Sequence, residues 1–161
     1  MSPRSHGRLE LETFLPYRLN VLASVVSQGL SSVYAERYGI GIPEWRVMAT
    51  LGQFGTLTAK VIGAHSRMHK TKVSRAVAAL SERDLLERRA NEQDLRAAFL
   101  TLSPAGRAIY DDLVPVAKAY AEALTEGLNA GERAVLDRLV TALTERGLRL
   151  MGAPLDDTSD A

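Results

Sequence analysis

The chain has 161 residues, 46% of them hydrophobic, with 20 basic against 19 acidic side chains and no cysteine. This length fits one domain with a sizeable core, and the lack of cysteine excludes disulfides, cysteine-ligated zinc or iron–sulfur sites and thiol redox sensing. Because the N-terminal segment lacks an apolar signal region and no stretch approaches the roughly 18 apolar residues of a membrane span, we expect a cytoplasmic protein without a membrane partner.

The charges are unevenly distributed along the chain. Residues 56–107 contain ten basic and five acidic side chains, a net charge of +5, whereas the rest of the chain has a net charge of −4. A basic segment between acidic flanks is typical of a region that binds a polyanion such as nucleic acid. A solvated charged surface would give the same pattern, so charge alone leaves both interpretations open.

Hydrophobic periodicity predicts a long helix over residues 10–37. Apolar residues recur there at three- and four-residue spacing, which forms a stripe along one side of the helix. Pro16 lies inside this pattern and either kinks the helix or marks the start of its regular part. Pro43 opens a second predicted helix, which extends to about Gly52, because a proline at the first helical position needs no N–H partner.

Two short helices joined by a tight turn are predicted in the basic segment. Thr58 is a candidate N-cap for the first helix, residues 59–64, and the turn covers residues 65–69. The second helix, residues 70–83, has apolar residues at positions i, i+4 and i+7 and exposes basic and hydroxyl side chains. This is the sequence shape of a helix-turn-helix, and many other helical hairpins share it.

Residues 86–90 and 97–102 are candidate strands around the polar segment 91–96. Their β-propensity is low, and Ala97–Ala98 would also suit a helix. A β-hairpin directly after a helix-turn-helix makes a winged helix, so we favour the hairpin.

Two further helices are predicted towards the end of the chain. Ser103–Pro104 indicates the start of a long helix with a bend at Pro115. Asn129 and Glu132 have capping-box spacing before the last helix. The acidic tail, residues 153–161, is expected to be disordered. The predicted fold class is mainly α with a small β-hairpin wing (α+β).

Residues 57–107 resemble the winged helix-turn-helix of the MarR family of bacterial transcriptional regulators. Four pieces occur in the family's order: Lys70-Thr71-Lys72-Val73-Ser74-Arg75 at the start of the recognition helix, Leu85-Leu86-Glu87-Arg88 before the wing, Asp94-Leu95-Arg96 at its tip, and Leu100-Thr101-Leu102 with Gly106 after it. The resemblance implies a single domain over residues 1–161, with a DNA-binding lobe at 43–103 and dimerisation helices at 10–40 and 104–151.

The recognition-helix segment departs from the family pattern at two positions. His69 stands where relatives often have an acidic residue, and Lys72 stands where a small hydroxyl residue is common. Base preference is therefore not transferred from the family.

The resemblance also implies a set of DNA contacts. The helix that begins at Lys70 would enter the major groove by its first turns and read base edges there. Thr58 would bind a phosphate, Arg96 would enter the minor groove, and Asp94 would hold the wing tip and orient Arg96. The implied DNA-contacting residues are Thr58, Lys70, Thr71, Lys72, Ser74, Arg75 and Arg96. The alternative interpretation is that these are solvated or capping residues, with a weak surface ion pair at the wing tip.

A second, shorter resemblance concerns an effector. Leu15-Pro16-Tyr17-Arg18-Leu19 and Ile42-Pro43-Glu44-Trp45-Arg46 resemble a subgroup linked to aromatic-acid catabolism, including sensors of hydroxycinnamoyl-CoA thioesters. It implies that Arg18, Trp45 and Arg46 lie in an effector pocket, where arginine pairs with a carboxylate or phosphate and tryptophan stacks on a ring. Alternatively, Trp45 is a core residue and the arginines pair with Glu44 or Glu36.

The favoured function is a homodimeric, ligand-responsive DNA-binding repressor, released from a pseudo-palindromic operator by a small aromatic acid or its CoA thioester. The alternative is a winged-helix protein-interaction module without DNA binding, which the basic recognition-helix and wing residues argue against. An enzyme is disfavoured because no nucleophile motif, Gly-rich phosphate loop or paired catalytic carboxylates are present. No cofactor is expected. No metal site is expected either, because His65 and His69 have helical spacing but no third ligand.

Overall fold

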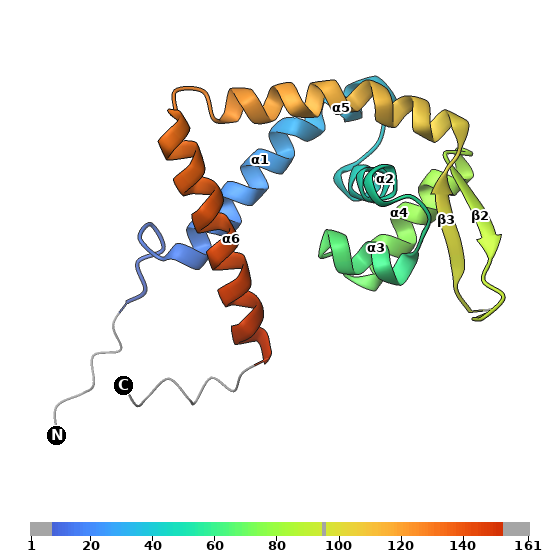
Figure 1. The fold of residues 1–161 in the computed structure, drawn as a ribbon, viewed down its shortest axis with the longest axis horizontal. Helices are drawn as coiled ribbons and strands as arrows, with labels where there is room; N and C mark the ends of the chain where they lie inside the picture. The colour runs from blue at the N-terminus through green and yellow to red at the C-terminus, as the bar shows by residue number, and fades with distance from the viewer. Residues whose placement is uncertain (1–7, 95, 153–161) are drawn as a thin grey trace. The chain divides into compact units, whose positions relative to one another are not determined.

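The computed structural model describes residues 8–94 and 96–152. The predicted disordered tail therefore lies outside the described residues. The chain divides into two compact units, residues 1–117 and 118–161, with the boundary inside the helix α5. The elements, shown in Figure 1, are α1 (Leu15–Tyr38), α2 (Ile42–Phe54), β1 (Leu57–Thr58), α3 (Ala59–Ser66), α4 (Lys70–Glu82), β2 (Leu86–Ala90), β3 (Ala98–Leu102), α5 (Pro104–Leu124) and α6 (Ala130–Gly152).

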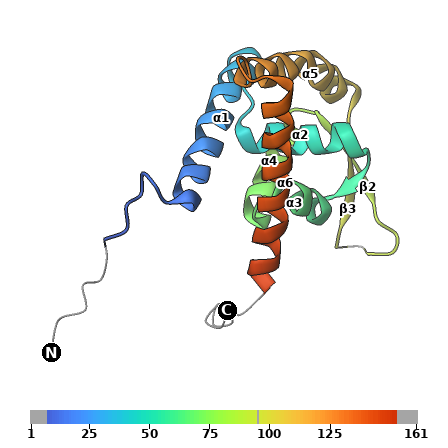
Figure 2. The same cartoon turned by 60° about the vertical axis from the view of Figure 1, so that its left-hand side comes forward.

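The core of the first unit lies between α2, α3, α4 and a small sheet. Figures 1 and 2 show these elements grouped into one lobe, from which the β2–β3 hairpin extends. Side chains from each of these helices and from β3 are no more than 1% exposed: Val47, Met48, Leu51, Ile62, Val73, Leu80 and Leu100. Burying one such branched side chain stabilises the fold by about 1.5–3 kcal/mol, so this core fixes how the exposed faces of α3 and α4 are presented.

The sheet has three antiparallel strands in the order β1-β3-β2. Leu86 pairs with Leu102 at the base of the hairpin, and Ala90 pairs with Ala98 near its tip. The strand predicted at 86–90 is confirmed, and the second strand begins one residue later than predicted, at Ala98. The predicted fold class, mainly α with a small β wing, is therefore confirmed.

Two helix boundaries differ from the sequence prediction for local reasons. The first helix begins at Leu15 rather than at residue 10, because Pro16 fits the first turn, where a missing N–H leaves no hydrogen bond unmade. The helix α3 continues to Ser66, and Arg67 then adopts a left-handed conformation with φ of 54°. The turn between α3 and α4 is therefore residues 67–69, shorter than the predicted 65–69.

The second unit begins within α5 and contains α6. The predicted capping box is confirmed, because Asn129 Oδ1 accepts from the N–H of Glu132 at 2.9 Å and Glu132 Oε2 accepts from the N–H of Asn129 at 2.8 Å. An ion pair of 2.8 Å joins Arg133 to Glu122. No residue of α6 is buried. Its large apolar side chains that remain exposed are Val135, Leu136, Leu139, Val140, Leu143, Leu148, Leu150 and Met151.

The helix α1 also leaves apolar side chains exposed. Tyr34 is its one buried residue, and the exposed members are Leu15, Tyr17, Leu19, Val21, Leu22 and Val25. Within the described residues, no helix combines the length and the apolar character needed to cross a membrane.

Candidate nucleic-acid interface

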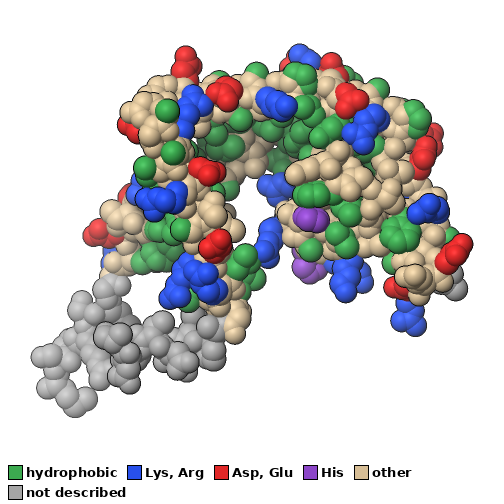
Figure 3. All heavy atoms as spheres, viewed as in Figure 1, with side chains coloured by type: hydrophobic (Ala, Val, Ile, Leu, Met, Phe, Trp, Pro, Cys, Tyr) green, Lys and Arg blue, Asp and Glu red, His purple; other side chains and the backbone are tan. Residues whose placement is uncertain are grey.

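The helix α4 buries one face and presents a basic, hydroxyl-rich face to solvent. Val73, Ala76, Val77 and Leu80 are buried against the core. The sequence-predicted DNA contacts on this helix are all exposed: Lys70, Thr71, Lys72, Ser74 and Arg75. The first turn of α4 contains no acidic residue, so nothing there opposes the approach of a polyanion. Figure 3 shows Lys and Arg side chains on the surface of this lobe and at the end of the hairpin.

The start of α4 is held by a histidine side chain. His69 is the N-cap residue, and its Nδ1 accepts a hydrogen bond from the backbone N–H of Thr71 at 3.3 Å. A buried Met68 and the left-handed Arg67 complete the turn from α3. This cap satisfies one of the N–H groups that a helix start leaves unpaired, which keeps the exposed residues of the first turn helical.

The two histidines that have helical spacing perform separate tasks. His65 lies in α3 and stacks on Phe54, with ring centroids 4.2 Å apart, while His69 uses its Nδ1 for the cap. Across the described part of the chain, no three potential metal-binding side chains gather.

Thr58 begins α3 and lies beside the wing. Its hydroxyl accepts from the N–H of Val61 at 3.4 Å, which confirms the predicted N-cap. In the sheet, Thr58 pairs with Phe99, and Phe99 in turn pairs with Arg89. The start of α3 and the wing are therefore joined through one sheet, so a phosphate group at Thr58 would lie next to the hairpin.

The tip of the wing is organised by Asp94. Its Oδ1 accepts from the backbone N–H of Arg96 at 3.0 Å, and its carbonyl accepts from the N–H of Ala97 at 3.0 Å. Asn91 makes a similar local contact, because its Oδ1 accepts from the N–H of Gln93 at 3.1 Å. These side-chain-to-backbone bonds are typical of Asx turns and shape the tip without a direct carboxylate–guanidinium contact. The Arg96 side chain remains exposed.

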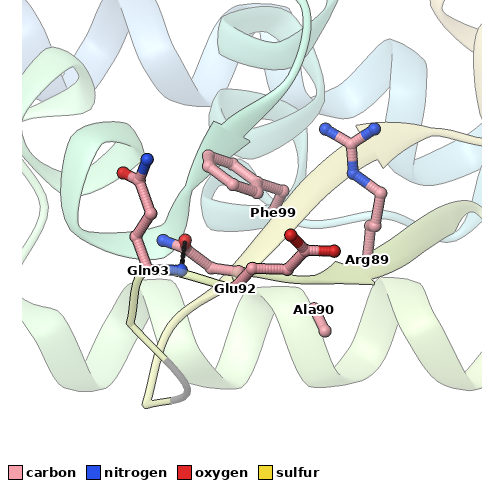
Figure 4. A pocket seen from close by; sticks show the side chains of 6 residues that line it. Arg89, Ala90, Glu92, Gln93 and Phe99 are labelled. Carbon is pink, nitrogen blue, oxygen red and sulfur yellow. Dashed lines mark hydrogen bonds between the residues drawn. The ribbon is translucent and has the colours of Figure 1, made fainter.

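A pocket of about 480 Å³ lies on the hairpin, as Figure 4 shows. Its lining residues are Arg89, Ala90, Asn91, Glu92, Gln93 and Phe99. The guanidinium carbon of Arg89 lies 5.7 Å from the centre of the Phe99 ring, a cation–π arrangement that covers one wall of the pocket. None of the sequence-predicted effector residues lines this pocket.

Two of the three sequence-predicted effector residues lie together where α2 meets α1 and α5. The Trp45 ring packs between Tyr34, at 5.6 Å, and Tyr110, at 6.2 Å. Arg46 Nη2 donates to Ser27 Oγ at 3.3 Å. Burial raises the pKa of Tyr34, while the nearby Arg46 guanidinium opposes that rise and Glu44 adds to it. An aromatic stack with a cation beside it is therefore present within the first unit.

The third predicted effector residue, Arg18, is farther away along α1. It precedes Ser27 by nine residues, so it lies about 13 Å along the helix axis from the contact with Arg46. The structure does not bring Arg18 to Trp45 and Arg46 within one chain.

Arg107 and Tyr110 of α5 join the aromatic stack but were not singled out from the sequence. Arg107 lies 5.2 Å from the Tyr110 ring and donates to the carbonyl of Gly52 at 3.4 Å. A Cβ on Gly52 would meet the Tyr110 ring at 2.3 Å, so α5 can approach α2 this closely only because the position is glycine. The sequence placed Gly52 at the end of the predicted helix, where glycine is common, but α2 continues to Phe54; a glycine within a helix is the signal that could have indicated this close approach.

The arrangement of α3, α4 and the hairpin defines the chain as a winged helix-turn-helix protein. Residues 38–97 match the sequence model of the MarR family. This match lies within the lobe and covers less than half of the chain, so the lobe is similar to the winged helix-turn-helix of MarR-family transcriptional regulators. No curated protein matches the sequence.

Solved structures with this fold include several bacterial regulators. A MarR/EmrR family regulator from Acinetobacter sp. ADP1 has a TM-score of 0.79 and 23% identity, covering 88% of this chain and 99% of its own. A MarR family regulator from Silicibacter pomeroyi has a TM-score of 0.71 and 27% identity, covering 86% and 96%. BpsR from Bordetella bronchiseptica, whose DNA binding is regulated by 6-hydroxynicotinic acid, has a TM-score of 0.67 and 21% identity, covering 79% and 98%.

Proposed function

We propose that this protein is a homodimeric, sequence-specific DNA-binding repressor whose release from DNA is controlled by a small aromatic acid or its CoA thioester. The exposed basic face of α4, capped at its start and supported by a buried apolar face, is the observation that carries the DNA-binding part. A helix-turn-helix presents such a face to the major groove, where base edges offer a distinct hydrogen-bonding pattern for each base pair. We place this function in the cytoplasm, where the DNA partner is found.

The residues of the interface divide into three roles. Lys70, Thr71, Lys72, Ser74 and Arg75 read bases or bind phosphates in the major groove. Thr58, at the start of α3, binds a phosphate with its hydroxyl and the free N–H groups of that helix start. Arg96 enters the minor groove, where negative potential attracts a guanidinium, and Asp94 keeps the wing tip in shape.

Homodimerisation accounts for the exposed apolar residues of α1 and α6. The helix α6 buries none of its residues within the described chain, although several large apolar side chains lie along it. Exposed apolar surface of this kind marks an interaction site. A two-fold dimer would carry two α4 helices and recognise half-sites about one helical turn apart.

The effector part rests on the aromatic stack of Tyr34, Trp45 and Tyr110 with Arg46 beside it. A planar aromatic ring matches the stack, and a carboxylate or phosphate matches the guanidinium. Arg18 remains part of this proposal only as a more distant cation, about 13 Å along α1 from the contact between Ser27 and Arg46. The regulation of BpsR by an aromatic acid supports the same class of effector for this chain.

The DNA-binding proposal is tested by selecting bound duplexes from a random pool and measuring affinity at two salt concentrations. We expect Arg75→Ala to cost about 1–3 kcal/mol on the selected duplex and to relax selectivity at one base position. Arg96→Ala should weaken binding while leaving the dimer intact, because it removes a guanidinium from the minor groove.

Lys118→Ala serves as the control, because it removes one exposed positive charge from α5, outside the proposed interface. If Arg75→Ala and Arg96→Ala both bind the selected duplex as tightly as the wild type does, the assignment of the DNA-binding face is wrong.

A further inference from the structure

Arg83 connects the far end of α4 to the end of α1. It is the C-cap residue of α4, thirteen residues beyond Lys70, and lies about 20 Å along the helix from the proposed DNA-reading end. Its Nη2 donates to the carbonyl of Tyr38 at 2.7 Å, and its Nη1 donates to the carbonyl of Gly39 at 3.4 Å. One guanidinium therefore holds two successive carbonyls of an element 44 residues earlier in the chain.

The end of α1 is a favourable place for such a contact. The last carbonyls of a helix have no N–H partner within the helix, and the helix dipole makes this end negative. Gly39 ends α1 in a left-handed conformation, with φ of 62°, which turns the chain away just after the last helical residue, Tyr38. The planar fork of arginine fits two neighbouring carbonyls and keeps its charge at every working pH, so the contact is both directional and permanent.

The same end of α1 also contacts α5. The Tyr38 hydroxyl donates to Asp112 Oδ2 at 2.7 Å, and Arg37 Nη1 lies 3.5 Å from that oxygen. The hydrogen bond to Asp112 raises the pKa of Tyr38 above its ordinary value. We name the group Arg37, Tyr38, Gly39, Arg83 and Asp112 the α1–α4–α5 joint.

From these contacts we infer that Arg83 is a positioning residue that fixes the angle of α4 against α1 and α5. This inference rests on the proposed function, in which two α4 helices of a dimer bind half-sites on one face of DNA. Because α1 and α5 belong to the proposed dimerisation region, the angle set at the joint determines the spacing of the two DNA-reading ends. A tilt of about 10° at Arg83 displaces a point about 20 Å away by about 3 Å, which is close to one base step.

The prediction that distinguishes positioning from simple stabilisation concerns half-site spacing. The test compares the selected full operator, a duplex with one half-site, and operators whose half-sites are one base pair closer or farther apart. Arg83→Gln removes the charge and the fork, Arg83→Lys keeps the charge on a single ammonium, and Lys118→Gln is the matched control for loss of one exposed positive charge on another element. Thermal unfolding of each dimer is measured in parallel, and Arg83→Lys replaces Arg83→Gln if the latter does not fold.

For Arg83→Gln we expect about tenfold weaker binding to the full operator and less than about twofold weaker binding to the single half-site, because only two-site binding depends on geometry. We also expect it to discriminate less than the wild type between operators of different spacing. The affinity of Arg83→Lys for the full operator should lie between those of Arg83→Gln and the wild type. The affinity of Lys118→Gln should equal that of the wild type.

The contrary outcomes separate the failure of this inference from the failure of the proposed function. If the wild type binds the operator and Arg83→Gln binds every duplex equally well, or loses affinity equally for the half-site and the full operator, then Arg83 does not position α4. If the wild type selects no duplex at all, the proposed DNA-binding function fails, and the inference fails with it.

Discussion

The imidazole of His69 links the sequence of the recognition turn to the stability of α4. The backbone N–H of Thr71 donates to His69 Nδ1 at 3.3 Å, so the side chain caps the first turn of the helix. The position commonly carries an acidic residue in the family that the sequence resembles. His69 performs this capping task without placing a carboxylate at the start of α4.

Substitutions at His69 test this cap. We expect His69→Ala to lower the free energy of unfolding by about 1 kcal/mol, as the loss of an N-cap usually does. His69→Asn should keep most of the stability, since its Oδ1 can accept from the same N–H. The measurement is urea unfolding of both variants and the wild type. An unchanged slope of the unfolding free energy against urea concentration would show that the folded and unfolded states are otherwise the same. Equal stability of His69→Ala and the wild type would show that the cap contributes nothing.

Tyr34 makes stability depend on pH in the alkaline range. Burial raises its pKa above the ordinary 10.0, so the folded protein keeps the phenol proton at pH values where the unfolded chain loses it. The resulting stability is fully present below about pH 10 and is lost as pH rises through the folded-state pKa.

We therefore expect the free energy of unfolding of the wild type to fall more steeply above about pH 10 than that of Tyr34→Phe, which keeps the ring but cannot ionise. Tyr38 titrates in both proteins, so its raised pKa contributes equally to the two curves. The measurement is the free energy of unfolding by denaturant at several pH values in this range. Equal dependence of this free energy on pH in the wild type and in Tyr34→Phe would refute the role of Tyr34.

At the scale of the elements, features encoded by neighbouring residues were predictable from the sequence. The capping box before α6, the apolar face of α4 and the strand β2 each depend on residues within a few positions of one another. The strand β1 was missed, because two residues show no periodicity and Leu57–Thr58 becomes a strand only by pairing with β3. The start of α1 was misplaced because its apolar stripe continues before Pro16 into a segment that is not helical.

The contacts between elements were less predictable than the elements themselves. The sequence identified Trp45 and Arg46 as a pair, but it could not show that Tyr34 and Tyr110 enclose the tryptophan. From the sequence alone, Arg83 is indistinguishable from an ordinary solvated residue at a helix end. Its partners are backbone carbonyls 44 and 45 residues away, and a backbone carbonyl is present at every position whatever the side chain. The roles of the DNA-contacting and effector residues stay predictions.

At the scale of the whole molecule, the exposed apolar side chains of α1 and α6 predict a dimer. An isolated helix in water is marginally stable, so α6, with no buried residue, needs a partner surface to remain helical. We expect light scattering to give twice the chain mass of 17.5 kDa at micromolar concentration.

A pair of substitutions in α6 locates the dimer surface. Leu139→Glu places a charge within the apolar stripe and should dissociate the dimer. Thr141→Glu introduces the same charge about 200° around the helix and should leave the dimer intact. A wild-type mass equal to one chain would rule out the dimer, and equal behaviour of the two variants would show that the stripe of α6 is not its interface.

Release from DNA by an effector is the last prediction, and it follows from linkage between two binding sites. Two half-sites require one particular spacing of the α4 helices. A ligand that binds better to another spacing must weaken DNA binding by the ratio of its affinities for the two states. A coupling of about 1–3 kcal/mol would lower DNA affinity about 5- to 150-fold. The proposed site lies where α2 meets α1 and α5, so a ligand bound beside Arg46 at the edge of the aromatic stack would contact both the proposed dimerisation helices and the proposed DNA-binding lobe.

The experiment titrates hydroxycinnamates, benzoates and their CoA thioesters into a preformed protein–operator complex. The thioester adds phosphates to the aromatic ring, so we expect it to act at lower concentration than the free acid. Arg46→Gln should bind the operator as the wild type does but should need a higher concentration of either ligand for release. The concentration needed by Arg46→Lys should lie between those of Arg46→Gln and the wild type, because lysine keeps the charge but lacks the planar fork of arginine. Persistence of the complex at about millimolar acid and about tens of micromolar thioester, which are ordinary pocket affinities, would eliminate the aromatic effector and leave the DNA-binding proposal unaffected.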